Sequence, residues 1–206
     1  MERKHVGIVL FENIEVLDFC GPFEVFSVTR INEEKRREEP SPFEIFLVAE
    51  KFASVTTEGG MKVLPDHTFE NCPKLDILVV PGGWGTRKEI NNCVMLDWLR
   101  NLASEVETLT SVCTGSMLLG SAGLLNGLHA TTHWRSLDWM RDSFPLVTVE
   151  YDKHVVVDGR VFTSAGISAG IDMALKVVAL YFGESIARAT ARQMEYTYSE
   201  DNSRRI

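Results

Sequence analysis

The sequence has few of the features that mark membrane-spanning, secreted or nucleic-acid-binding proteins. Its apolar runs are short, and none approaches the roughly 20 residues that cross a bilayer. Residues 1–11 begin with charges and continue directly into an apolar segment, so we expect no signal peptide. Lys and Arg number 21 against 29 Asp and Glu, a formal net charge of −8. Because phosphate binding needs a basic surface, this balance argues against nucleic acid as a partner.

Cysteine is also scarce, and the four cysteines are scattered: Cys20, Cys72, Cys93 and Cys113. They show no CxxC or other metal-type spacing, so we expect no metal site, and we expect no other cofactor. A reducing cytoplasm is the simplest location, with Cys113 as a free thiol. Repeats, low-complexity tracts and an interdomain linker are absent too. A chain of 206 residues with 45% hydrophobic content therefore predicts one domain over residues 1–206.

What the chain does contain is an alternation of apolar strands and helices. The patterns predict strands at 5–11, 43–49, 77–80, 108–112, 147–151, 155–157 and 161–163, and a small hairpin around Gly59-Gly60. They predict helices at 23–28, 94–103, 116–122, 134–141, 171–182 and 185–196. The turn Asp158-Gly159 is a strong hairpin signal. This order predicts an α/β fold with a doubly wound, mostly parallel sheet in three layers, which binds ligands at the carboxyl ends of its strands.

Cys113 lies at the junction between a predicted strand and a predicted helix. Residues 108–112 form the apolar strand, Gly115 allows a sharp turn, and the helix opens near Ser116. The amides and dipole at a helix start favour a thiolate, and the arrangement resembles a strand–nucleophile–helix elbow. A buried core cysteine is the alternative. The junction favours Cys113 as a nucleophile.

A second loop at the same predicted edge contains Pro81-Gly82-Gly83, directly after the strand at 77–80. Glycine lets backbone N–H groups approach a ligand closely. Together with the N–H of Thr114, the amides of Gly82 and Gly83 could form an oxyanion hole.

Asp18 lies in an apolar context just ahead of the helix expected after Gly21-Pro22. It is suited to cap that helix, or alternatively to place a carboxyl close to the thiol. Beside a thiolate and away from water its pKa would rise, so it could act as a proton donor. Glu24 competes for the same role, and local physics does not separate the two.

His133 follows a short extended segment and could return to the active end of the sheet. A Cys–His pair is a common way to activate a thiol. A structural histidine held by backbone hydrogen bonds is the competing interpretation. Asp138 or Glu150 could orient a catalytic histidine, although nothing in the sequence singles them out.

Six segments match the motifs of one family in order along the chain: 17–26 (LDFCGPFEVF), 81–86 (PGGWGT), 111–115 (SVCTG), 122–127 (AGLLNG), 130–134 (ATTHW) and 163–172 (TSAGISAGID). Together they resemble the ThiJ/PfpI superfamily, whose fold is a flavodoxin-like three-layer α/β/α sandwich related to class I glutamine amidotransferases. Members are typically homodimers that act on small molecules, and the resemblance implies the same here.

Within the superfamily, the signatures around Asp18 and Cys113 look like the isonitrile hydratase branch. They also look like the sensor-like domains that precede AraC-type DNA-binding modules, and Ser164-Ala165-Gly166 is closer to these sensors. The hydratase resemblance implies that the Cys113 thiolate attacks an isonitrile, that Asp18 supplies or relays the proton, and that amides of Gly83 and Thr114 hold the intermediate. It implies that His133 is not needed as a triad base.

Two other functions are compatible with the same thiol. One is a glyoxalase-like or amidase-like activity on small carbonyl compounds. The other is a redox or ligand sensor without turnover, in which Cys113 is oxidised or binds a ligand reversibly. The chain ends at Ile206, too early for a second helix-turn-helix domain, and it is acidic. We therefore expect a free-standing enzyme.

Overall fold

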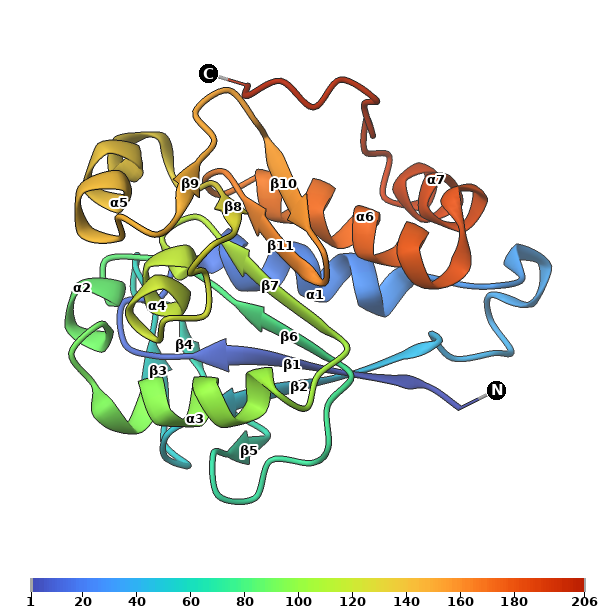
Figure 1. Cartoon of the computed structure of the whole chain (residues 1–206). Helices are drawn as coiled ribbons and strands as arrows, with labels where there is room; N and C mark the ends of the chain where they lie inside the picture. Colours follow the sequence, from blue (N-terminus) through green and yellow to red (C-terminus); the bar gives the residue numbers. More distant parts are fainter. Residues whose placement is uncertain (1, 206) are drawn as a thin grey trace.

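The computed structural model describes residues 2–205 and is organised by a seven-stranded sheet (Figure 1). In spatial order the strands are β10 (Val155–Asp158), β11 (Val161–Ser164), β7 (Thr108–Val112), β6 (Ile77–Val80), β1 (Lys4–Leu10), β2 (Phe43–Ala49) and β5 (His67–Thr68). All neighbours are parallel except the β10–β11 hairpin. The central strands β6 and β7 are buried along their whole length, which explains their continuous apolar or β-branched sequences.

Helices cover both faces of this sheet (Figure 1). On one face lie α1 (Val16–Val28), α6 (Ala169–Phe182) and α7 (Glu184–Gln193), and on the other α3 (Cys93–Ala103) and α4 (Gly115–Ser121). Short helical pieces complete the chain: η1 (Glu33–Lys35), α2 (Thr86–Glu89), η2 (Trp134–Ser136) and α5 (Leu137–Ser143). The predicted three-layer, mostly parallel α/β architecture is confirmed.

Two small sheets lie outside the main one. The predicted hairpin around Gly59-Gly60 is present as β3 (Val55–Thr56) and β4 (Lys62–Val63), paired antiparallel. The strand expected at 147–151 is reduced to β9 (Thr148–Val149), which pairs with β8 (His129–Ala130) rather than with the main sheet. The Asp158-Gly159 turn does join β10 to β11, with Gly159 at φ +57°.

The first helix begins earlier in the chain than the sequence predicts. We expected it to begin after Pro22, whereas α1 begins at Val16 and contains Pro22 inside it. Pro22 and Gly21 pack against α6: a Cβ on Gly21 would lie 3.1 Å from Ile171, and a Cβ on Gly170 would lie 3.5 Å from Pro22. The close packing of these two helices outweighs the preference of proline for a first turn. As a result, Asp18 lies inside the helix and does not cap it.

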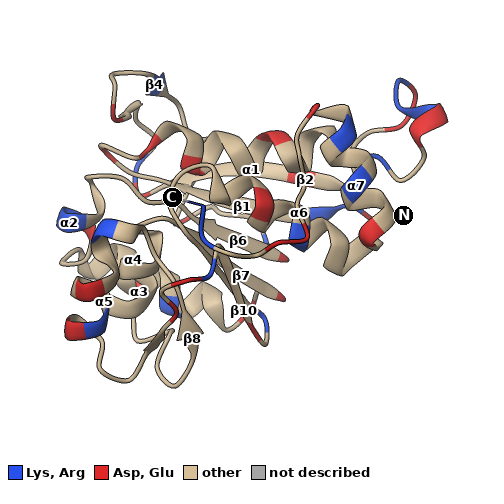
Figure 2. Ribbon diagram, turned by 90° about the horizontal axis from the view of Figure 1, so that it is seen from above, with Lys and Arg blue, Asp and Glu red and all other residues tan. Residues whose placement is uncertain are grey.

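The topology gathers four neighbouring strand ends at one edge of the sheet. β11, β7, β6 and β1 are parallel neighbours, so the loops that follow them leave from the same edge. Acidic and basic residues are interspersed over the surrounding elements rather than gathered on one basic face (Figure 2). Within residues 2–205, no helix is long and apolar enough to cross a membrane.

Candidate functional site

Cys113 occupies a strained position between β7 and α4. Its φ is +56°, in the left-handed region that costs a residue with a side chain about 1–3 kcal/mol. Hydrogen bonds hold this geometry: its N–H is shared between the carbonyls of Ser164 and Ala165, both at 3.2 Å, and its carbonyl accepts from the Thr132 hydroxyl at 2.9 Å. The side chain is only 6% exposed. Strain held by the surrounding loops is a frequent property of nucleophile elbows.

Asp18 is the acidic group next to this thiol. Its carboxyl is fully buried, and Oδ2 accepts the N–H of Gly82 at 2.9 Å. Within the described chain Oδ1 has no hydrogen-bond partner of normal geometry. Burial raises the pKa of Asp18 well above its ordinary 3.8; the Gly82 N–H and the Cys113 thiol only partly oppose this. A carboxyl of this kind can carry a proton near neutral pH.

The surroundings of Cys113 favour the S–H form of the thiol over the thiolate. Burial raises the pKa of Cys113, and the charge of Asp18 raises it further. The N–H groups of Thr114 and Ile167 and the Thr114 hydroxyl lower the pKa, but by less. These donors would stabilise the sulfur once it becomes negative. The charge of Asp18 thus disfavours a thiolate at Cys113, whereas the Cys113 thiol, through its hydrogen bond, favours the Asp18 carboxylate.

The glycine loop after β6 shapes the site in a different way from the one predicted. The N–H of Gly82 donates to Asp18, and the N–H of Gly83 donates to the Thr114 hydroxyl at 3.0 Å. Both amides are therefore hydrogen-bonded within the protein, and their role in an oxyanion hole stays a prediction. A Cβ on Gly82 would lie 2.6 Å from the Thr114 nitrogen and 2.9 Å from Asp18. The glycine is required for this close approach.

Gly115 makes an even closer approach, and its replacement tests the packing of the elbow. A Cβ there would lie 2.0 Å from the carbonyl oxygen of Val80, which is main chain and has little room to move. We expect Gly115→Ala to lower the free energy of unfolding by about 3 kcal/mol. The matched control is Gly59→Ala, which meets nothing within 4 Å but has φ +89°, and should cost about 1 kcal/mol. Denaturant unfolding measures both; equal losses would contradict the steric explanation.

His133 lies at the rim of the same site but is not paired with the thiol. Its Nδ1 accepts the N–H of Arg135 at 3.3 Å, and no hydrogen bond joins it to Cys113 within residues 2–205. Burial lowers its pKa, as do the charges of Arg135, Arg204 and Arg87. Among the described residues no hydrogen bond or ion pair joins His133 to either suggested orienting group: Asp138 pairs with Arg141, and Glu150 pairs with His129. The geometry favours the structural interpretation.

Of the two acidic candidates, the helix brings only Asp18 to the site. Glu24 lies on the exposed side of α1, where its carboxylate accepts from Ser27 at 3.5 Å. Six residues separate it from Asp18, which turns the two side chains to different sides of the helix. Neither carboxyl is among the residues that line the pocket above Cys113, but Asp18 contacts the thiol directly from beneath the pocket lining, and Glu24 does not act on it.

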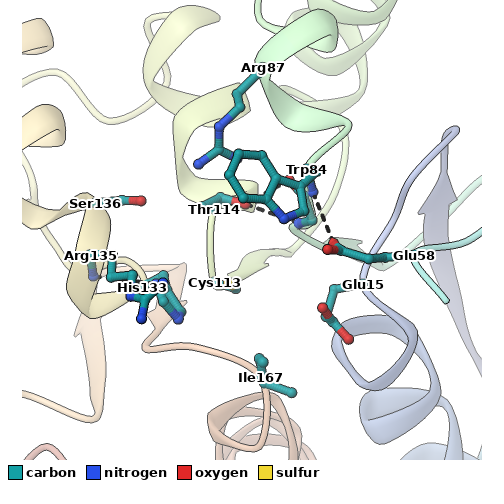
Figure 3. Close-up of a pocket in the computed structure, with 11 residues that line it drawn as sticks. Glu15, Glu58, Trp84, Arg87, Cys113, Thr114, His133, Arg135, Ser136 and Ile167 are labelled. Atoms are coloured by element: carbon teal, nitrogen blue, oxygen red, sulfur yellow. Dashed lines mark hydrogen bonds between the residues drawn. The ribbon is translucent and has the colours of Figure 1, made fainter.

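A pocket of about 190 Å³ opens above the thiol (Figure 3). It is lined by residues from the loops after β1, β3, β6, β7, β8 and β11: Glu15, Glu58, Gly83, Trp84, Arg87, Cys113, Thr114, His133, Arg135, Ser136 and Ile167. Ile167 has φ +54°, a strained value for a β-branched residue, and its N–H acts on the thiol. The described residues contain no cluster of three or more metal-binding side chains.

A profile of the DJ-1/PfpI family matches residues 4–180, which include the site described above. The chain belongs to the DJ-1/PfpI family. The resemblance on which the sequence prediction rested is thereby confirmed, together with the fold.

Among DJ-1/PfpI relatives, an isonitrile hydratase from Pseudomonas putida is 37% identical over 191 residues, covering 93% of this chain and 78% of that protein. The transcriptional regulator CdhR from Pseudomonas aeruginosa is 34% identical over 139 residues, but the match covers 68% of this chain and only 41% of the regulator. A crystal structure of a ThiJ/PfpI family protein from Pseudomonas syringae superposes with a TM-score of 0.83 at 30% identity, covering 95% of this chain and 76% of that one.

The charged rim of this pocket was not predicted from the sequence. Glu15, Glu58, Arg87 and Arg135 lie in or beside loops far apart in the sequence, and no local pattern distinguishes them from solvated surface residues. Their position along the chain is the one signal that could have indicated them, because three of these four residues come within a few positions after the end of a strand.

Proposed function

We propose that the protein hydrates an isonitrile to an N-substituted formamide, with Cys113 as nucleophile and Asp18 as the proton carrier. The observation that carries the proposal is the pairing of a buried thiol with a buried carboxyl beside it, while within residues 2–205 no histidine is hydrogen-bonded to the sulfur. An isonitrile carbon accepts both a nucleophile and a proton. A thiol and a carboxyl that share protons supply both partners of that addition.

The first step adds the S–H group across the isonitrile carbon. Asp18 accepts the proton of the Cys113 thiol as sulfur attacks R–N≡C, and delivers it to the same carbon, giving the thioimidate R–N=CH–S–Cys113. The N–H groups of Thr114 and Ile167 stabilise negative charge on sulfur during this step. Asp18 is again a carboxylate when the thioimidate is complete.

The second step consumes one water. Asp18 accepts one proton from the water as the water oxygen bonds to the thioimidate carbon, and it passes this proton to the nitrogen, giving R–NH–CH(OH)–S–Cys113. Asp18 then accepts the hydroxyl proton as the carbon–sulfur bond breaks, and it passes that proton to the sulfur while R–NH–CHO leaves. The sum is R–N≡C + H₂O → R–NH–CHO, with thiol and carboxyl restored.

The relatives favour this reaction over the alternatives. The match to the isonitrile hydratase extends over 93% of this chain, whereas the match to CdhR covers 68%. A buried thiol with a raised pKa is also a poor target for mild oxidants, which weakens the redox-sensor alternative. We propose in addition that the protein acts as a homodimer, as the family resemblance implies.

The test is the conversion of cyclohexyl isocyanide to N-cyclohexylformamide by the wild-type protein. We expect catalytic turnover, followed by gas chromatography with mass detection, and one ¹⁸O atom in the product when the reaction is run in H₂¹⁸O. Heat-unfolded protein provides the blank. Absence of formamide from protein with a folded circular-dichroism spectrum would overturn the proposal, and methylglyoxal would be the next substrate to assay.

A further inference from the structure

The rim of the pocket is divided by charge. Arg87 on α2 and Arg135 on η2 lie on one side together with His133, and Glu15 and Glu58 lie on the opposite side, with Cys113 between them (Figure 3). A pocket that separates charges in this way orients a charged substrate about the reacting sulfur.

Neither side of the rim is neutralised by an ion pair. Within residues 2–205 no carboxylate lies within 4 Å of the guanidinium of Arg87 or Arg135, and no cationic side chain lies within 4 Å of the carboxylate of Glu15 or Glu58. The two carboxylates repel each other, since burial and then the charge of Glu58 raise the pKa of Glu15, and Oε2 of Glu58 accepts the N–H of Trp84 at 3.4 Å. An anion is therefore favoured on the arginine side of the pocket and disfavoured on the glutamate side.

Aromatic rings hold both arginines without using their hydrogen-bond donors. The Arg87 guanidinium lies 4.0 Å from the centre of the Trp84 ring, and that of Arg135 lies 4.8 Å from the centre of the Trp134 ring. A stacked guanidinium keeps its in-plane N–H groups free for a carboxylate. These arginines also lower the pKa of His133, after burial, which indicates that their positive charge reaches into the pocket.

We propose that the preferred substrate is a small isonitrile that bears a carboxylate, which Arg87 and Arg135 bind while the isonitrile carbon faces Cys113. The inference rests on the proposed hydration reaction. A pocket of about 190 Å³ suits a small substrate. The carboxylate must lie close to the isonitrile because both arginines line the pocket that contains the thiol.

The test compares isocyanoacetate with its methyl ester, which differ in charge but share the isonitrile group. Charge-assisted hydrogen bonds to two arginines predict at least a tenfold higher kcat/KM for the acid with wild-type protein. This preference should shrink as salt is raised, since both arginines are exposed. Formation of the formamide is followed by proton NMR for each substrate.

Variants identify the binding groups. We expect Arg87→Gln and Arg135→Gln each to lower the acid-to-ester ratio of kcat/KM about tenfold, and Arg192→Gln, an exposed arginine on α7, to leave the ratio at the wild-type value. Turnover of the ester with no preference for the acid would overturn the inference while leaving the hydration intact. A preference that survives both pocket variants would overturn the assignment to these arginines. Turnover of neither substrate, nor of cyclohexyl isocyanide, would instead refute the proposed function.

Discussion

Replacing Cys113 by alanine is expected to reduce formamide production to the rate seen without protein, a loss of about 10⁴-fold or more. Alanine keeps the Cβ at this position of φ +56°, so the elbow and its hydrogen bonds to Ser164 and Ala165 can remain. Only the sulfur is lost, and with it the covalent intermediate. The measurement is kcat/KM for cyclohexyl isocyanide, with circular dichroism to establish that the variant is folded.

Cys93 provides the matched control. It is exposed at the start of α3, away from the pocket, and Cys93→Ala should keep wild-type turnover. The same variant removes the most accessible thiol. A covalent adduct that mass spectrometry finds on Cys93→Ala protein must then lie on Cys20, Cys72 or Cys113, and peptide mapping can assign it. If Cys113→Ala retained more than a tenth of the wild-type activity, Cys113 would not be the nucleophile.

The location of the site could be predicted because the topology determines it. Two apolar segments, 77–80 and 108–112, read as buried strands, and in a parallel sheet their carboxyl ends face the same edge. Gly82, Gly83 and Cys113 can therefore be predicted to lie together from the sequence. The lengths of the loops do not matter for this prediction, since each of these residues lies within three positions of a strand end.

The helical part of the site was harder to predict, because its signals are ambiguous. Pro22 favours a helix start in isolation, but packing against Gly170 and Ile171 of α6 places it in the middle of α1. Consequently the sequence could not choose between Asp18 as a helix cap and Asp18 beside the thiol. The choice depends on the direction of α1, which long-range contacts set.

The charge state of the thiol illustrates a second limit. A helix start after Cys113 was expected to favour the thiolate, and the N–H of Thr114 does act in that direction. Burial nevertheless outweighs it, and the Asp18 carboxyl adds to the effect. Neither the depth of a pocket nor a contact between residues 95 positions apart has a local signature in the sequence.

Replacing Asp18 by asparagine is expected to lower kcat/KM for the isonitrile by about 10²–10⁴-fold, since proton transfer by a positioned side chain contributes that much. The asparagine carbonyl can still accept the N–H of Gly82, which lies 2.9 Å from Oδ2, so the loop after β6 keeps its anchor. The thiol should remain open to alkylation by iodoacetamide in the Cys93→Ala background. Loss of turnover with retention of the thiol would separate proton transfer from nucleophile accessibility.

The pH dependence gives this prediction an independent readout. The reactive pair holds one proton, on the Cys113 thiol, and needs Asp18 as a carboxylate to accept it. Because burial raises the pKa of Asp18 well above 3.8, acidification adds the second proton at a correspondingly higher pH. Wild-type kcat/KM should therefore decrease on acidification at a pH well above 4, and Asp18→Asn should not show this decrease. Glu24→Gln, on the exposed side of the same helix, should keep both the wild-type rate and the wild-type decrease on acidification. Unchanged turnover in Asp18→Asn would remove this carboxyl from the mechanism.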